Sequence, residues 1–283
     1  MKKILVPVDF SKASITALDV AAEIAKKAGA EVVALHVVEE TGESSFNVMG
    51  EVARESFEDR LFTLKLIEKS KKQLEKLVLD QKYNSIKLDG ELRLGNAFHG
   101  MNTIIAEQKV DLVVMGTRGH SRLEEMIIGS NTEKVVRHAK IPVLSVHKKP
   151  NKVNFKNIVY ATSMSKDEEP FAKVVKNAQE MYNSKVHLVR INTPGDFQRD
   201  RVAIDYMEKF AKKLGLKNYT VNIYNDITEE EGIIYFAESI NADMIAMATH
   251  GRTGFAHVLA GSIAEEVVNH AKRPVLTQVI RRK

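Results

Sequence analysis

The sequence predicts an α/β fold, built from two repeated doubly wound α/β sandwich domains that each hold a five-stranded parallel sheet. Apolar runs of strand length alternate with helical segments along the chain, an order typical of a parallel sheet covered by helices on both faces. The same order then starts again in the second half. An internal repeat of this size fixes the architecture before any functional residue is considered.

The repeat is clearest around two glycine-containing turns. Residues 116–130 read GTRGHSRLEEMIIGS and residues 248–262 read ATHGRTGFAHVLAGS, so the second copy follows the first by 132 positions (248 − 116). Between 129–144 and 261–276 the two copies agree at 11 of 16 positions. Each copy therefore combines an apolar run, a turn, and Gly-Ser at the start of a helix.

The first half begins with a continuous apolar strand and an amphipathic helix. Ile4 to Val8 is apolar throughout, and Ser11 to Lys27 carries its apolar residues on one helical face before a stop at Gly29. The further elements expected in this half are a strand over 31–38, a loop over 41–55, a helix over 56–79, a strand over 86–94, a helix over 96–108, a strand over 111–115, a helix over 130–139 and a strand over 142–146.

The second half repeats this order after a polar link. Residues 147–156 are polar and include Pro150, which suits a domain boundary. We therefore expect one domain over 1–147 and another over 156–283. The strands expected in the second half cover 157–162, 186–191, 219–224, 243–248 and 274–279, and the helices cover 166–182, 203–214, 231–240 and 262–271.

Composition excludes several classes of protein. The 283 residues include no cysteine, and 42 basic side chains are interleaved with 37 acidic ones for a net charge of +5. The lack of cysteine excludes disulfides and thiolate metal sites and fits a cytoplasmic protein. No stretch approaches the roughly 20 apolar residues of a membrane span, and Asp9 interrupts the first apolar run too early for a signal peptide. No aromatic platform lies among the basic residues, so we expect neither a nucleic-acid nor a membrane partner.

The turn after the fourth expected strand predicts a phosphate site. Ligands of open α/β sheets bind at the carboxyl ends of the strands, where the strand order reverses. Gly116 and Gly119 permit close approach of the backbone. Gly129 lets an anion lie against the N–H groups of a helix start. The hydroxyls of Ser130 and Thr132 are expected to donate to phosphate oxygens.

Other strand ends predict contacts to a base and a ribose. Asp9 can accept from a base amino group or a ribose hydroxyl, and Val37 can supply an apolar wall. Each residue alone also has an ordinary structural interpretation: Asp9 and Ser130 as helix caps, and Val37 as core. Arg118 can reach a phosphate or lie in solvent. The site is predicted from the combination of these residues.

Other catalytic and nucleotide-binding motifs are absent from the sequence. Gly95 and Gly100 have the spacing of a P-loop, but Met101 stands where the loop needs lysine. No dinucleotide fingerprint, HExxH motif, EF-hand loop or G-x-S-x-G elbow occurs. Residues 116–119 match the GXXG loop of KH domains, which the order of elements contradicts. No nucleophile has an assignable base, so we predict no catalytic residue and no protein metal site.

Together these features resemble the universal stress protein family in its tandem two-domain form. The first half opens with ILVPVDFS, continues with LHVVEE, and carries the spacing Gly116-x2-Gly119-x9-Gly129-Ser130. The second half repeats the pattern with MATHGRTG and AGS. The resemblance implies an adenine nucleotide alpha hydrolase-like fold, and members of the family with the glycine motif bind ATP.

The resemblance also implies how the domains pair and which residues bind the ligand. The two last strands, here 143–146 and 275–278, are expected to pair within one chain as a pseudo-dimer, and a homodimer of chains is left open. ATP is the expected ligand, with Mg²⁺ as its companion because hard cations bridge phosphates. The implied binding residues are Pro7, Asp9, Val37, Met115, Gly116, Arg118, Gly119, Gly129, Ser130, Asn131 and Thr132.

The second half departs from this pattern by losing a glycine, a carboxylate, an amide and a hydroxyl. Each lost hydrogen bond costs about 0.5–1.5 kcal/mol, so two or three losses predict a site roughly 10- to 1000-fold weaker. The replacements are Ala248 for Gly116, Ser163 for Asp9, Ile263 for Asn131 and Ala264 for Thr132, and the second-domain candidates that remain are Gly251, Gly261 and Ser262.

The leading hypothesis is a cytoplasmic ATP-binding stress protein that acts as a sensor or regulator, with ATP held mainly by the first domain. One alternative is a structural or interaction protein that binds no nucleotide. Another is a slow ATPase or phosphate-transfer enzyme, for which only Arg118 and His120 could stabilise transition-state charge. A further alternative gives the second half a different small ligand, contacted by Ser163, Arg190 and His250.

Overall fold

The computed structural model describes residues 1–39, 57–117, 129–148, 150, 153–250 and 263–280. Strands and helices alternate there in the predicted order, with two short 3₁₀ helices (η) in addition. The first half contains β1 (Lys3–Pro7), α1 (Lys12–Ala28), β2 (Glu31–Val38), α2 (Phe57–Val78), η1 (Gln81–Tyr83), β3 (Lys87–Leu94), α3 (Ala97–Gln108), β4 (Leu112–Gly116), α4 (Ser130–His138) and β5 (Val143–Val146). The second half contains β6 (Asn157–Ala161), η2 (Lys166–Glu168), α5 (Glu169–Tyr182), β7 (Lys185–Asn192), α6 (Asp200–Leu214), β8 (Tyr219–Asn225), α7 (Glu229–Ser239), β9 (Met244–His250), α8 (Ile263–His270) and β10 (Val275–Ile280).

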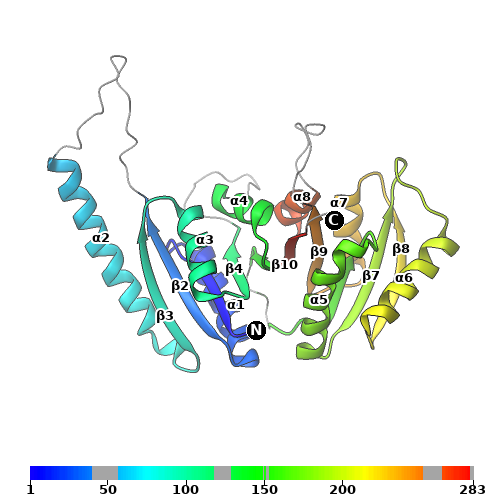
Figure 1. The fold of residues 1–283 in the computed structure, drawn as a ribbon, viewed down its shortest axis with the longest axis horizontal. Helices are drawn as coiled ribbons and strands as arrows, with labels where there is room; N and C mark the ends of the chain where they lie inside the picture. Colours follow the sequence, from blue (N-terminus) through cyan, green and yellow to red (C-terminus); the bar gives the residue numbers. More distant parts are fainter. Residues whose placement is uncertain (40–56, 118–128, 149, 151–152, 251–262, 281–283) are drawn as a thin grey trace, which may run out of the picture.

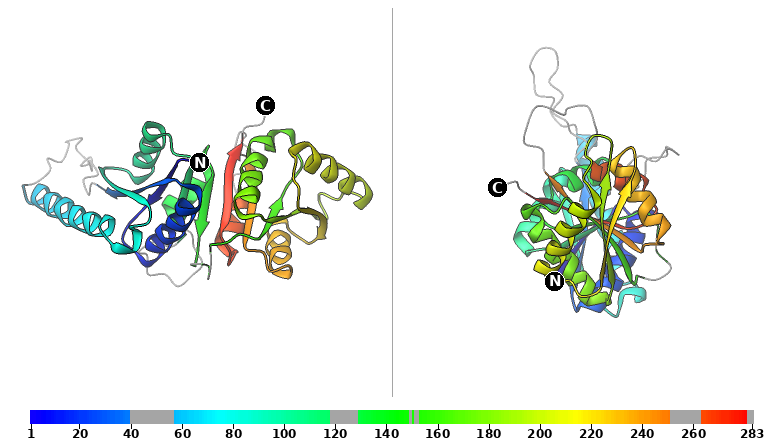
Figure 2. Two further views of the ribbon diagram at one scale, coloured as in Figure 1. Left: turned by 90° about the horizontal axis from the view of Figure 1, so that it is seen from below. Right: turned by 90° about the vertical axis from the view of Figure 1, so that its right-hand side faces the viewer.

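The ten strands form one continuous sheet in the order β3-β2-β1-β4-β5-β10-β9-β6-β7-β8. Within each half every strand pair is parallel, whereas β5 and β10 pair antiparallel at the centre. Figure 1 shows the two halves side by side, and the left view of Figure 2 shows β5 (green) next to β10 (red) between them. The fold is therefore the predicted pair of doubly wound α/β units, joined into one mostly parallel sheet.

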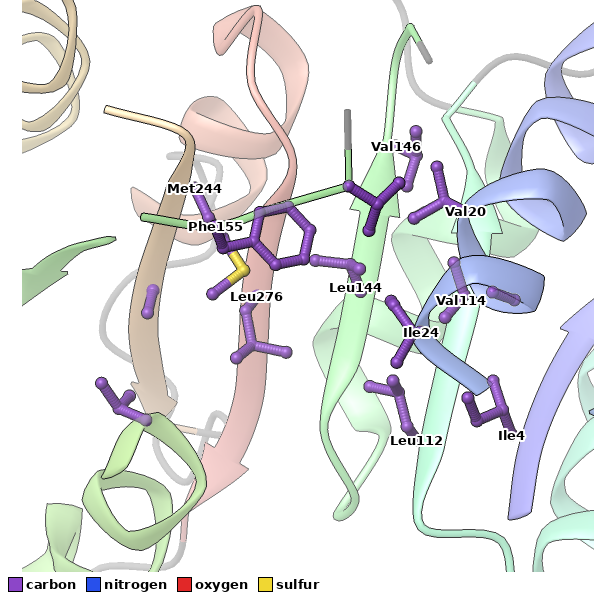
Figure 3. Close-up of a cluster of buried hydrophobic side chains, with 14 of the residues drawn as sticks. Ile4, Val20, Ile24, Leu112, Val114, Leu144, Val146, Phe155, Met244 and Leu276 are labelled. Carbon is purple, nitrogen blue, oxygen red and sulfur yellow. The ribbon is translucent and has the colours of Figure 1, made fainter. Parts of the chain in front are cut away.

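The central strand pair is the one that the resemblance implies. Leu144 lies opposite Leu276, and Ser145 lies opposite Val275. Figure 3 shows Leu144 and Leu276 next to each other on neighbouring strands, with Phe155 close by. The seam between the halves is thus a buried apolar layer as well as a ladder of backbone hydrogen bonds.

Helices cover both faces of the sheet, as parallel strands require because they are buried on both sides. One core packs α1, α2, α5 and α6 against one face, and a second core packs α3, α4, α7 and α8 against the other. The views in Figure 2 show these helices on either side of the strands. None of the helices in the described part of the chain combines the length and the apolar character that a membrane crossing needs.

Two helix starts differ from the sequence expectation by three residues. The helix expected over 166–182 opens with the 3₁₀ turn η2, and α5 begins only at Glu169, where Pro170 supplies a backbone angle suited to a first turn. The helix expected from Ala203 begins three residues earlier at Asp200, whose carboxylate favours a helix N-terminus. The apolar periodicity starts only at Ala203, so it could not reveal this first turn.

Candidate functional site

A cavity of about 570 Å³ opens at the carboxyl ends of β1, β2 and β4, beside the start of α4. The strand order of the first half reverses between β1 and β4, so the cavity lies where open α/β sheets bind ligands. Nine of the eleven residues predicted for this half line it, and the other two, Arg118 and Gly119, lie outside the described residues. The nine are Pro7, Asp9, Val37, Met115, Gly116, Gly129, Ser130, Asn131 and Thr132.

The cavity has further walls that the sequence did not single out. Leu66 comes from α2 and Met101 from α3, and both look like ordinary core positions of amphipathic helices. Ser14 is a small polar residue in α1, and its position gave no signal either. The additional lining residues are Val8, Ser14, Leu35, His36, Val38, Glu39, Leu66, Ala97 and Met101.

Gly116 is the position where the site has no room for a side chain. A Cβ atom there would lie 2.7 Å from the backbone carbonyl carbon and oxygen of Ala13, and 3.0 Å from its Cβ. Because the obstacle is backbone, it cannot move aside as a flexible side chain would. Glycine therefore allows the end of β4 to pass directly against the first turn of α1.

The first turn of α4 lines the cavity without a side-chain cap. Gly129 is the N-cap residue, its backbone is extended, and no side-chain cap hydrogen bond is present there among the described residues. The N–H of Gly129 itself donates to the carbonyl oxygen of Thr117 at 3.0 Å, which ties the start of α4 to the end of β4. The interpretation of Ser130 as a helix cap is therefore wrong, and the N–H groups of this turn are suited to an anion.

The expected role of Thr132 needs correction. Its Oγ1 donates to the carbonyl oxygen of Gly116 at 3.0 Å, and the residue is buried. The hydroxyl proton is thus used to fix the helix start to the end of β4, rather than being directed at a phosphate oxygen. The hydroxyl of Ser130 lies on an exposed residue of the same turn.

Asp9 lies in the turn between β1 and α1. Its Oδ1 accepts from the N–H of Ser11 at 2.9 Å, and its own N–H donates to Oγ of Ser14 at 3.3 Å. Ser11, and not Asp9, is the N-cap of α1. Nearby, the ring of His36 lies 4.6 Å from the ring of Phe10, and its Nδ1 lies 2.7 Å from the carbonyl oxygen of Val8. The contacts with Ser11 and Ser14 fix the turn that places Asp9 in the wall of the cavity.

Comparison with known families decides the relationship that the glycine motif indicated. The model of the universal stress protein family matches residues 1–147 and again residues 154–277. The chain belongs to the universal stress protein family. Its two matches make it a tandem member.

Named relatives agree with this assignment. Universal stress protein MJ0531 of Methanocaldococcus jannaschii is 34% identical over 157 residues, which are 53% of this chain and 84% of that protein. Universal stress protein Slr1230 of Synechocystis is 22% identical over 98% of this chain and 99% of its own length. A solved universal stress protein from Archaeoglobus fulgidus matches 98% of this chain and 96% of its own with a TM-score of 0.74 at 22% identity, which supports the tandem fold.

The second half of this universal stress protein presents a different set of groups at the equivalent strand ends. Ala248 lies in β9 at the position of Gly116, and Ser163 follows β6 at the position of Asp9. The candidates Gly251, Gly261 and Ser262 lie outside the described residues. Arg190 is paired with Asp196 at 2.8 Å, so its guanidinium already has a carboxylate partner.

Two contacts connect the first-half site to helix α8 of the second half. Oγ1 of Thr117, the residue after β4, lies 2.8 Å from Nδ1 of His147, and Nε2 of His147 contacts the carbonyl oxygen of Val268. Arg137 of α4 is paired with Glu265 of α8. The helix whose start lines the cavity is thus tied to the other half at its far end.

The described residues offer no ready protein site for a metal ion. No group of three or more His, Asp or Glu side chains in that part of the chain is placed to hold one. A divalent cation at this site would have to take most of its ligands from a bound polyphosphate and from water, as Mg²⁺ commonly does.

Proposed function

We propose that residues 1–147 form an ATP-binding domain and that the chain acts as a cytoplasmic sensor or regulator in the stress response. The observation that carries the proposal is the uncapped first turn of α4, which lines the cavity together with Gly116. A helix N-terminus with unsatisfied N–H groups attracts phosphate through hydrogen bonds and through the helix dipole.

The remaining walls suit the other parts of the nucleotide. Val37, Leu35 and Met115 supply apolar surface from β2 and β4, which fits a planar base. Asp9 adds a carboxylate at the end of β1 that can accept from an amino group or a hydroxyl. Members of the family that carry the glycine motif bind ATP, and the motif of this half is complete in the sequence.

The second domain, residues 156–283, is proposed to bind ATP weakly or not at all. It has Ser163 in place of the carboxylate, and Ile263 and Ala264 in place of the amide and hydroxyl at the helix start. Its strand β9 carries the methyl group of Ala248 where the first half needs glycine. We therefore expect one nucleotide per chain.

The test is calorimetric titration of the full chain with ATP, compared with the variant Gly129→Asp. The backbone of Gly129 is extended, so an aspartate there can cap α4 and satisfy its N–H groups. The new carboxylate also occupies the place of a phosphate and repels it. We expect an affinity at least about 100-fold lower, since two charge-assisted hydrogen bonds of about 1.5–3 kcal/mol each are lost.

The matched control is Gly195→Asp, which adds the same charge at a position with open space around it. Thermal unfolding should show Gly129→Asp to be as stable as the parent chain or more so, because the added cap stabilises α4. Unchanged ATP affinity in Gly129→Asp would contradict the proposed phosphate site. A parent chain that ignores ATP at millimolar concentration would instead favour an interaction protein.

A further inference from the structure

The turn that follows the first strand is built in the same way in both halves. Phe10 and Met164 each adopt a left-handed backbone with φ 62, and the preceding strands and the N-cap serines Ser11 and Ser165 align at the same offset of 154 (164 − 10). This offset pairs Asp9 with Ser163 and Ser14 with Glu168. The second half has therefore lost a carboxylate from the turn and gained one in the first turn of the helix that follows.

The carboxylate of Glu168 is buried and surrounded by donors. The residue is only 2% exposed. Its Oε2 accepts from the hydroxyls of Tyr160 at 3.1 Å and Thr162 at 2.6 Å. Its Oε1 accepts from the N–H of Ser163 at 3.0 Å and from the hydroxyl of the same serine. Four hydrogen bonds compensate the burial of this charge.

The equivalent place in the first half is arranged differently. Ser14 lines the cavity, and its Oγ accepts the N–H of Asp9 at 3.3 Å. The short side chain of Ser14 leaves room for the cavity beside the end of β1, whereas the carboxylate of Glu168 extends to Thr162 and Ser163 at the end of β6. The strand residues also differ, because Val6 and Val8 stand where Tyr160 and Thr162 supply hydroxyl donors to Glu168.

We infer that Glu168 closes the second-half site to adenine nucleotides. This inference rests on the proposed function of the first half. The carboxylate of Glu168 fills the space that corresponds to the one beside Ser14 in the first half. It also accepts from both the N–H and the hydroxyl of Ser163, the residue that aligns with Asp9. A nucleotide entering this site would have to displace a buried charge from four partners and would itself bring like charge.

The inference differs from simple decay of the glycine motif. The second half lacks residues equivalent to Asp9, Asn131 and Thr132. This loss only removes attractive contacts to a nucleotide, so it predicts weaker binding. Glu168 adds an internal occupant with its own satisfied hydrogen bonds, so it predicts exclusion. Removing this one side chain should then have a larger effect than restoring any single lost contact.

The experiment is ATP titration of full-length chains with their binding stoichiometry measured. The test variants are Glu168→Ser, which copies the first half, and the double exchange Ser163→Asp with Glu168→Ser. The matched control is Glu169→Ser, which removes the next carboxylate along the chain, one that pairs with Lys213 instead. We expect one nucleotide per chain for the parent and the control, and a second nucleotide for the double exchange.

The first-half site serves as an internal standard in each titration. If the parent binds one ATP and the double exchange also binds one, the inference about Glu168 is overturned while the proposed function stands. If the parent binds no ATP, the proposed function of the first half is contradicted, and the inference that rests on it falls with it. If the parent binds two with equal affinity, Glu168 does not exclude nucleotide and the inference is again overturned.

A second measurement does not depend on gaining a ligand. Amide hydrogen exchange of Ser163 reports directly on its bond to Glu168. In the parent chain we expect slow exchange at Ser163 that ATP does not change, and exchange at least about tenfold faster in Glu168→Ser than in Glu169→Ser. Equal exchange in the two variants would show that Glu168 does not hold the turn, and would overturn the inference even if the second-half site stays closed for another reason.

Discussion

Arg137 and Glu265 lie in different halves of the chain and form a two-pronged ion pair across the seam. Nε of Arg137 lies 2.7 Å from one carboxylate oxygen of Glu265, and Nη2 lies 2.6 Å from the other. The same guanidinium also contacts Glu133 at 2.8 Å. Glu133 and Glu265 occupy equivalent positions of α4 and α8, at the repeat offset of 132 (265 − 133). One arginine therefore serves both copies of this glutamate.

Replacing Arg137 should weaken the association of the two halves. The side chain of Glu265 is only 7% exposed, so Arg137→Met removes a doubly hydrogen-bonded cation from a nearly buried carboxylate. We expect a loss of roughly 1.5–3 kcal/mol in the free energy of unfolding, the range for hydrogen bonds to charged groups. Urea unfolding measures this, with Lys72→Met as the control because its pair with Glu68 is exposed and should contribute under about 0.5 kcal/mol.

Adding a methyl group at Gly116 should disturb the fold and the site together. The new Cβ would meet the backbone of Ala13 at 2.7 Å, so β4 and α1 would have to separate. Overpacking of this kind typically costs about 1–3 kcal/mol. Thermal unfolding and ATP titration of Gly116→Ala should both show losses, whereas Gly195→Ala, which meets open space, should change neither. A variant Gly116→Ala with parental stability would show that the close contact is not required.

The hydroxyl of Thr132 provides a test of where its proton goes. Thr132→Val keeps the shape but removes the donor to the carbonyl oxygen of Gly116. We expect a loss of about 1–2 kcal/mol in unfolding free energy without any ligand present, and Thr132→Ser should recover most of it. If Thr132→Val instead keeps its stability and loses only ATP affinity, the hydroxyl acts on the ligand, as the sequence alone had suggested.

Tyr182 should make the stability of the chain sensitive to high pH. Burial, with a smaller contribution from the charge of Glu23, raises the pKa of its hydroxyl to about 12 from 10.0. A raised folded-state pKa means that the neutral form is favoured in the folded protein. Its contribution to stability is therefore complete below pH 10 and is lost as the pH rises from 10 to 12.

The variant Tyr182→Phe isolates this effect. Among the described residues the hydroxyl has no hydrogen-bond partner, so its removal should leave stability at pH 7 unchanged or slightly higher. The ring should keep its contacts with Phe155 and Lys27. Chemical unfolding from pH 9 to 12 should show a shallower decline for the variant. An identical decline in both chains would assign the alkaline sensitivity to other groups.

Much of the fold could be predicted because the strands are buried on both faces and read as continuous apolar runs. Ile4 to Val8 and 111–115 are examples, and the structure has strands there with boundaries within one or two residues. The start of α6 at Asp200 could not be predicted, because the three residues before Ala203 place no apolar side chain in the core. The pairing of β5 with β10 came from the family resemblance, since no residue in either strand specifies its partner.

The candidate site was predictable where close packing excludes a side chain, as at Gly116 beside the backbone of Ala13. It was less predictable where a polar side chain can choose between partners. The hydroxyl of Thr132 donates a hydrogen bond to a carbonyl 16 residues earlier in the sequence, and no local sequence pattern indicates this partner. Glu168 was missed for the same reason, because an acidic residue near a helix start is ordinary in sequence and only its burial distinguishes it.

The antiparallel pairing of β5 with β10 places both partners of one interface on a single polypeptide. In a dimer of identical subunits every substitution is present twice, so one copy cannot change without the other. Covalent fusion removes that restriction: the copies stay at a fixed one-to-one ratio whatever the dilution. Substitutions can then change the site residues of one half while the other half keeps its own.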